Sequence, residues 1–232
     1  MPALRRLRVV ALSILFAFVT LFYLMNERNT WNYGYSPYPD FPSAADLKPI
    51  IWSPLPDRYP VSSLIALPTG APKDIPAVQS SLPAESGKQK KERLRRRDIV
   101  KESFQHSWRG YKEHAWLRDE VAPISGRHRN TFGGWAATLV DSLDTLWILG
   151  FKEDFELAVT AAESINFNST DQDLINVFET TIRYMGGFLG AYDISDGKYP
   201  SLLKKATEVG DLLMSCFDTP NRMPITRWDW QQ

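Results

Sequence analysis

Apolar residues recur at helical spacing through most of the second half of the chain, with no strand-like alternation of apolar and polar residues. In the first such segment, Phe104, Trp108, Tyr111 and Ala115 lie at positions i, i+4, i+7 and i+11, on one stripe of a helix expected to end near Asp119. Four later segments share this period: residues 136–150, 152–165, 175–193 and 200–213. The short connections between them predict an all-α fold of consecutive helical hairpins.

Two residues mark expected helix ends. Gly150 closes the segment 136–150 as a C-terminal stop. Pro200 opens the last segment, because proline is favoured in the first turn of a helix. We place the globular domain at residues 93–232, starting where the helical period begins.

The N-terminus indicates a membrane anchor. Arginines at positions 5, 6 and 8 precede an uncharged apolar run of 17 residues, Val9–Met25. A helix of this length measures about 25 Å, at the short end of what spans a bilayer. Since no small-x-small cleavage site follows, we favour a type II signal anchor over a cleaved signal peptide. Residues 1–8 are then cytoplasmic, and everything after Met25 is lumenal.

Residues 26–92 are expected to form a disordered lumenal stem. Eleven of the sixteen prolines lie between residues 26 and 87, with no sustained helical or alternating period. Such a segment buries too little apolar surface to offset the entropy of ordering it.

A basic run, Lys88–Asp98, contains seven Lys and Arg residues. We interpret it as the solvated face of the first helix. A sharper hypothesis is that Arg93-Leu94-Arg95-Arg96 is a processing site that frees the downstream domain. The chain has 27 basic and 27 acidic residues, so its balance gives no indication of a nucleic-acid partner.

Two further residues bear on the compartment. Cys216 is the single cysteine, so no intrachain disulfide is possible, and we expect it to be a buried apolar residue. The sequon Asn168-Ser169-Thr170 lies in a loop between two expected helices. In a lumenal protein it predicts glycosylation of Asn168.

The segment 175–193 carries two stripes. Phe178, Ile182, Met185, Leu189 and Tyr192 have helical spacing, and we expect them to form its buried face. The neighbouring stripe is polar and small, and contains Glu179, Arg183, Gly186 and Gly190.

This second stripe has two interpretations. Glu179 and Arg183 have the i,i+4 spacing of a helical ion pair. The glycines, including Gly187, each cost a helix about 1 kcal/mol relative to alanine, which indicates that something approaches this face closely. Either a neighbouring helix or a substrate could approach in this way. The pattern alone favours close packing of a neighbouring helix.

Two carboxylates in the string DSLDT, Asp141 and Asp144, share one face of an otherwise apolar helix. Paired carboxylates can bind sugar hydroxyls, bind a metal or perform acid/base chemistry. The alternative is a favourable interaction with the helix dipole, which suits Asp141 better than Asp144.

Longer strings are more specific: RNTFGGWAATLVDSLDTLWILGFKEDFELA, VFETTIRYMGGFLGAYDIS and RMPITRWDW. From about Phe104 to Trp230 the chain resembles the class I α-1,2-mannosidases of glycoside hydrolase family 47. The resemblance implies an (αα)7 barrel, of which this chain would form a part, around a calcium ion below a sugar-binding cavity. Such enzymes remove terminal α-1,2-linked mannose from high-mannose N-glycans of glycoproteins, with inversion. The anchor and stem fit the family's Golgi and endoplasmic-reticulum members.

The same resemblance implies roles for four residues. Glu179 would be the acid-side carboxylate, which protonates the departing oxygen directly or through a water. Arg183 would orient the glycan. Asp141 and Asp144 would line the barrel interior and support the substrate.

The family's other essential carboxylates and its calcium-ligating threonine belong to later hairpins, beyond Gln232. We therefore expect no calcium ligand among these residues, and no glycan hydrolysis by this polypeptide alone. The alternative is a non-catalytic, membrane-anchored protein with a glycan-binding or partner-binding surface. The intact family motifs favour the enzyme.

Overall fold

The computed structural model describes residues 50–51, 53–54, 56–71, 73–74, 76–170 and 172–230. The expected anchor, Val9–Met25, lies outside these residues, as does the first part of the expected stem. Among the residues described, no helix combines the length and the apolar character needed to cross a bilayer.

The described part of the chain is mainly helical, which confirms the all-α expectation. Its α-helices are α2 (Gly87–His114), α3 (Ala137–Asp141), α4 (Leu143–Leu149), α5 (Lys152–Glu163), α6 (Val177–Glu179), α7 (Gly186–Ile194) and α8 (Pro200–Met214). A π-helical segment, η1 (Thr180–Met185), joins α6 to α7, and a short 3-10 helix, η2 (Ser215–Phe217), follows α8.

Short strands occur as well, which the sequence analysis did not expect. They form three antiparallel pairs: β1 (Ile50–Ile51) with β4 (Ser169–Thr170), β2 (Glu120–Val121) with β3 (His128–Arg129), and β5 (Leu174–Asn176) with β6 (Arg227–Asp229). Strands of two or three residues are too short to show an alternating pattern in the sequence.

The first helix is shifted relative to its expected bounds. It begins at Gly87, six residues before the expected start of the globular part, because Ser86 and Gln89 form a capping box. It ends at His114 rather than near Asp119, and Leu117 beyond it has a left-handed backbone. Asp119 instead lies in the loop that follows, fully buried.

The expected helix 136–150 is divided into α3 and α4 at Ser142, whose hydroxyl donates to the carbonyl oxygen of Thr138 at 2.7 Å. A hydroxyl bonded to the preceding turn competes with regular helix geometry. The two carboxylates of DSLDT therefore lie on either side of a break. Gly150 ends α4 with a left-handed backbone, as expected.

The buried face expected for 175–193 was wrong. Phe178 and Ile182 are 65% and 51% exposed, whereas Tyr184, Phe188 and Ala191, one residue away in phase, are fully buried. Both stripes are apolar, so periodicity could not choose between them. What distinguishes the buried stripe is a polar contact: the Tyr184 hydroxyl donates to the carbonyl oxygen of Phe132, at 2.6 Å.

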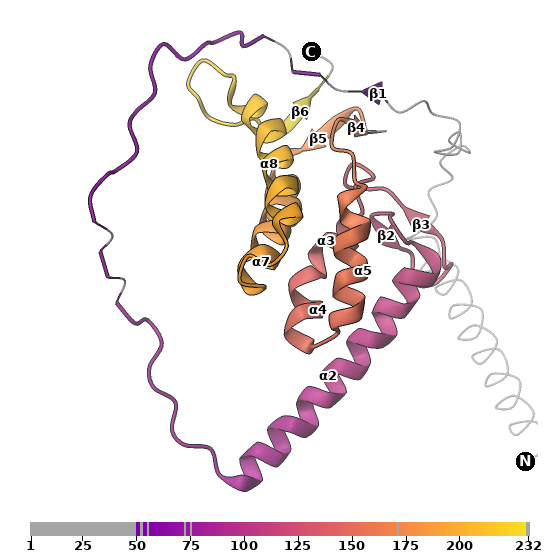
Figure 1. The fold of residues 1–232 in the computed structure, drawn as a ribbon. Coiled ribbons are helices and arrows are strands. Elements are labelled where there is room, and N and C mark those ends of the chain that lie inside the picture. Colours follow the sequence, from indigo (N-terminus) through magenta and orange to yellow (C-terminus); the bar gives the residue numbers. More distant parts are fainter. Residues whose placement is uncertain are drawn as a thin grey trace, which may run out of the picture. The chain divides into compact units, whose positions relative to one another are not determined.

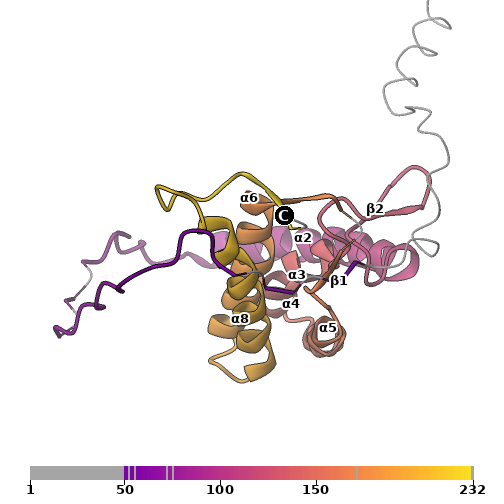
Figure 2. The same cartoon turned by 90° about the horizontal axis from the view of Figure 1, so that it is seen from above.

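The helices pack as two neighbouring hairpins, and Figures 1 and 2 show the α4–α5 pair beside the α7–α8 pair. The core contains a cluster of edge-to-face aromatic rings whose centroids are 5.2–6.0 Å apart. Its members are Trp135, Phe167, Tyr184 and Phe188. This contact holds the segment α6–η1–α7 against the rest of the core.

Candidate active site

Arg183 lies at the centre of a charged cluster. Its Nε donates to Oε2 of Glu179, and its Nη1 donates to Oδ2 of Asp141, each at 2.5 Å. The expected i,i+4 pair is therefore present, and a third residue from α3, 42 positions away in sequence, joins it. One guanidinium thus bridges two carboxylates that come from different helices, α6 and α3.

An aromatic ring fixes the same guanidinium from another side. The Cζ atom of Arg183 lies 4.3 Å from the ring centroid of Phe132, within the range of a cation–π interaction. Arginine suits this position because its planar fork can pair with two carboxylates and stack on a ring at once.

Local sequence positions Glu179. The side chain of Asn176 caps α6 by accepting a hydrogen bond from the backbone N–H of Glu179 at 3.2 Å. The π-helical segment begins at the next residue and carries Arg183. Single π-turns inside helices often occur at functional sites.

The cluster is open to a ligand. Side-chain exposures are 24% for Glu179, 31% for Arg183 and 34% for Asp141, so each is partly covered and still reachable from solvent. A sugar approaching this face would meet two carboxylates and a guanidinium already fixed in position.

The electrostatics shift two pKa values. Burial raises the pKa of Asp141, the attraction of Arg183 opposes the rise without cancelling it, and the charges of Glu179 and Asp144 add to it. For Arg183, burial disfavours the charged form, but the bonds to Glu179 and Asp141 outweigh it and raise the pKa. The site therefore favours a cation at Arg183 and makes Asp141 easier to protonate than a free aspartate.

Asp144 has a different position from Asp141. Its Oδ1 accepts a hydrogen bond from the hydroxyl of Thr145 at 3.1 Å, and it acts on Asp141 through its charge. The structure thus brings Glu179, Arg183 and Asp141 into one bonded cluster, with Asp144 beside it.

The glycines divide between the two explanations. A Cβ on Gly187 would lie 2.8 Å from Cγ1 and 3.0 Å from the carbonyl oxygen of Val140, so this glycine permits α7 to pack closely on α3. A Cβ on Gly190 would meet no described atom within 4 Å, and one on Gly186 would meet only the carbonyl oxygen of Thr181, at 3.8 Å. Helix packing accounts for Gly187, and the space beside the other two is open.

Sequence reasoning missed the residue that supports this site from within. Asp119 is fully buried, and its carboxylate accepts hydrogen bonds from the backbone N–H groups of Phe132, Gly134 and Ala137 at 2.7–3.2 Å. These bonds hold the loop that places Phe132 beside Arg183. Burial, followed by the charge of Asp119, raises the pKa of Tyr184 well above its usual range. A lone aspartate after a helix carries no signal that would have revealed this role.

The described residues do not fit a calcium site. Among them, no group of three or more His, Cys, Asp or Glu side chains could hold a metal ion. Glu179 and Asp141 already share the positive charge of Arg183. Any calcium that the family requires would need oxygen ligands other than this cluster.

The sequon contacts the loop that follows Asp119. Asn168 is exposed, and Thr170 is buried with its hydroxyl donating to the carbonyl oxygen of Gly133 at 3.0 Å. Exposure of the asparagine is compatible with a glycan, and glycosylation of Asn168 stays a prediction.

The chain is similar to known proteins over about half of its length. The model of glycosyl hydrolase family 47 matches residues 103–232. A mannosyl-oligosaccharide 1,2-alpha-mannosidase of Arabidopsis thaliana is 44% identical over 130 residues, covering 56% of this chain and 22% of that protein. An endoplasmic reticulum mannosyl-oligosaccharide 1,2-alpha-mannosidase of Rattus norvegicus is 41% identical over 131 residues, covering 55% and 19%.

A solved structure is similar too. The alpha-1,2-mannosidase of Trichoderma reesei aligns with a TM-score of 0.57 and 31% identity, covering 60% of this chain and 31% of that one. The chain thus spans about a fifth of the length of the two relatives and about a third of the solved structure.

Proposed function

The chain belongs to glycosyl hydrolase family 47, and from this we propose that it contributes the acid-side carboxylate to the active site of a mannosyl-oligosaccharide 1,2-α-mannosidase. The observation that carries the proposal is the partly exposed, bonded cluster of Glu179, Arg183 and Asp141, of which the first two belong to the family motif VFETTIR. The relatives are named for this activity.

Each residue of the cluster has a distinct part. Glu179 is held in an ion pair with Arg183. It would hold a water that passes its proton to the departing glycosidic oxygen, the indirect route of general acid catalysis. Arg183 would donate to sugar hydroxyls. Asp141, bonded to the same guanidinium, would be a positioning residue.

In an inverting glycosidase, a second carboxylate activates the attacking water from the opposite face of the sugar. Asp141 is occupied by Arg183. We propose that the opposing base and the calcium ligands lie outside this cluster. The described hairpins would then form part of an (αα)7 barrel wall. No step of the reaction is assigned to calcium.

We further propose a place in the secretory pathway, since the Rattus norvegicus relative is named for the endoplasmic reticulum. High-mannose N-glycans on glycoproteins would be the substrates. A single-pass type II orientation through Val9–Met25 would put the catalytic part in the lumen of the Golgi or the endoplasmic reticulum.

A chimera tests the proposed activity. Residues 103–232 would replace the matching segment of the Trichoderma reesei enzyme, and release of mannose from α-1,2-mannobiose would be followed by chromatography. We expect a folded chimera to release mannose, Glu179→Gln to abolish the release, and Glu163→Gln, on the exposed face of α5, to preserve it.

Two outcomes would reject the proposal. A folded chimera without any release would show that the segment lacks catalytic competence and would favour a non-catalytic glycan-binding role. Release that persists in Glu179→Gln would show that Glu179 is not the acid-side residue.

A further inference from the structure

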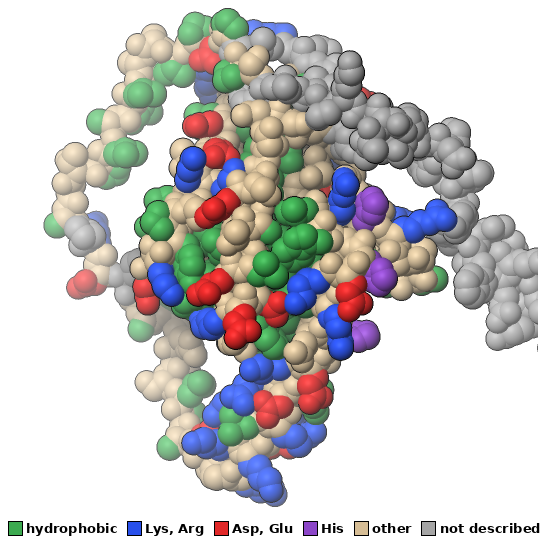
Figure 3. Space-filling view, turned by 45° about the vertical axis from the view of Figure 1, so that its right-hand side comes forward, with side chains coloured by type: hydrophobic (Ala, Val, Ile, Leu, Met, Phe, Trp, Pro, Cys, Tyr) green, Lys and Arg blue, Asp and Glu red, His purple; other side chains and the backbone are tan. Residues whose placement is uncertain are grey.

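The helix α2 has two unlike halves. Its C-terminal half packs through Phe104, Trp108 and Tyr111, and Trp108 is the first buried residue of the helix. Its N-terminal half is largely exposed and extends away from the other helices (Figure 1). Lys and Arg side chains gather at this end of the molecule (Figure 3).

The exposed half contains the sequence Arg93-Leu94-Arg95-Arg96, followed by Arg97. The four arginine side chains are 53–74% exposed. Their partners are Glu85, Glu92 and Asp98, all at or near the surface, and such exposed ion pairs contribute little to stability.

An endoprotease must bind its substrate as an extended strand, so this helical segment has to unwind locally. Unwinding from Gly87 as far as about residue 100 separates no buried side chain from the core, because burial begins at Trp108. Segments with few buried contacts open at low free-energy cost. The basic sequence is therefore accessible to cleavage without unfolding the domain.

A second feature decides what a cut would do. The described residues Ile50–Ile51 and 56–59, here called the clasp, contact the globular part at two places. Backbone N–H groups of Arg58 and Tyr59 donate to the Asp218 carboxylate at 2.7 and 2.9 Å, and β1 pairs with β4.

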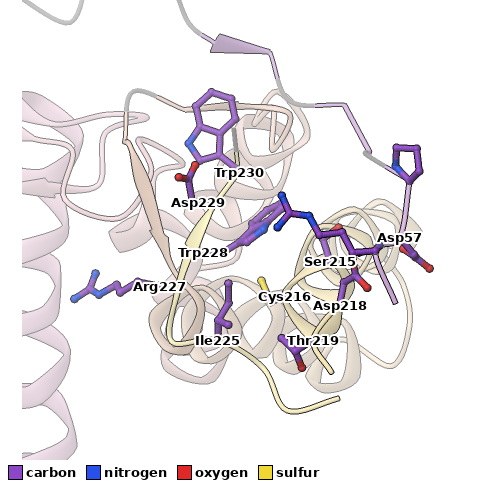
Figure 4. Close-up of a pocket in the computed structure, with 12 residues that line it drawn as sticks. Asp57, Ser215, Cys216, Asp218, Thr219, Ile225, Arg227, Trp228, Asp229 and Trp230 are labelled. Carbon is purple, nitrogen blue, oxygen red and sulfur yellow. Dashed lines mark hydrogen bonds between the residues drawn. The ribbon is translucent and has the colours of Figure 1, made fainter. Parts of the chain in front are cut away.

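The clasp also helps to line a cavity. Pro56, Asp57 and Arg58 line it together with residues of η2 and β6, among them Cys216 and Trp228, and Figure 4 shows Asp57, Cys216 and Trp228 around it. These contacts cross more than 100 residues of sequence, so they would survive a break in the chain between them.

We propose that the Arg96–Arg97 bond is a processing site for an endoprotease that recognises paired basic residues, and that the clasp keeps the two products together. Hydrolysis adds one water across the peptide bond, leaving a carboxylate on Arg96 and an amino group on Arg97. The upstream product then stays bound through Asp218 and β4. Cleavage alone does not free the domain, contrary to the simplest interpretation of the sequence, and this inference is independent of the proposed glycosidase activity.

Digestion of the full-length chain, purified in mild detergent, tests the cleavage. An endoprotease specific for Arg-x-Arg-Arg should give a fragment with Arg97 at its N-terminus, identified by mass spectrometry. Arg93→Gln and Arg96→Gln should lose this product, whereas Lys88→Gln should keep it. An absent product, or one that Arg96→Gln leaves unchanged, would overturn the site.

Affinity capture through an N-terminal tag tests the clasp after the cut. The fragment beginning at Arg97 should be retained at neutral pH. It should be released from the Asp218→Asn variant but not from the control variant Asp193→Asn. Near-UV circular dichroism would first confirm that both variants are folded. As a second measurement on the unaltered sequence, acidification should release the fragment. Release of the fragment from the parent chain at pH 7 would overturn the clasp. Retention of the fragment in a folded Asp218→Asn variant would overturn it as well.

Discussion

Arg183 and Asp141 lie 42 residues apart in the sequence and are joined by a hydrogen-bonded ion pair, Nη1 to Oδ2, at 2.5 Å. This bond connects η1, which continues into α7, with the end of α3, on the side where Glu179 is held. The arrangement of charged side chains around Arg183 therefore depends on the packing of η1 against α3, and not on one helix alone.

The raised pKa of Asp141 has a consequence for stability. A carboxyl group whose folded pKa lies above its unfolded value binds protons more tightly in the folded state, so its contribution to stability falls as pH rises from about the ordinary value of 3.8 through the raised one. In Asp141→Asn this part of the pH dependence should be missing. Urea unfolding between pH 3.5 and 6 measures it, and an unchanged difference between variant and parent across that range would contradict the assignment.

The lowered pKa of Asp218 has the opposite sign. Hydrogen bonds from the backbone of Arg58, and then of Tyr59, favour the carboxylate, so the stabilisation by the clasp is present above the ordinary pKa and is lost as pH falls through the lowered one. Amide hydrogen exchange at Arg58 and Tyr59 should accelerate in acid relative to a model peptide. The Asp218→Asn variant should lose that pH dependence. If both amides were protected at neutral pH as strongly in the variant as in the parent chain, the contact with Asp218 would be refuted.

Gly187 and Gly190 form a matched pair in α7. Gly187→Ala places a methyl group against Val140 and should destabilise by about 1–3 kcal/mol, as overpacking does. Gly190→Ala meets no described atom within 4 Å and should stabilise by up to about 1 kcal/mol through helix propensity. Chemical denaturation of the two variants gives both values, and a neutral Gly187→Ala would show that α3 and α7 are not in close contact.

Asp119→Ala should be the more damaging change in the loop. It leaves three backbone donors, one buried and two part-buried, without their acceptor, and we expect a loss of about 3 kcal/mol. Asp173→Ala, at an exposed position, should be close to neutral. The comparison is made by thermal unfolding, and similar melting temperatures for the two variants would exclude a structural role for Asp119.

Much of the site could be predicted from sequence because its first contact is local. Glu179 and Arg183 are four residues apart, and helical spacing alone brings them together. Asp141 and Asp144 stood out as a pair, but only tertiary packing shows that Asp141 reaches Arg183 while Asp144 pairs with Thr145.

The remaining features could not be read from local patterns. In α7 two adjacent stripes are both apolar, so the phase of burial was ambiguous. Asp119 and the contact of Asp218 with Arg58 depend on residues brought together from distant parts of the chain. Strands of two residues leave no periodic signal at all.

The central claim is that Arg183, held by Glu179 and Asp141, contacts mannose. Saturation-transfer NMR with α-1,2-mannobiose and the folded chain tests this most directly. We predict saturation transfer to the sugar protons, its loss in Arg183→Gln and its retention in Arg109→Gln, on the exposed surface of α2. Transfer that is absent from the parent chain, or that survives Arg183→Gln unchanged, would contradict the account.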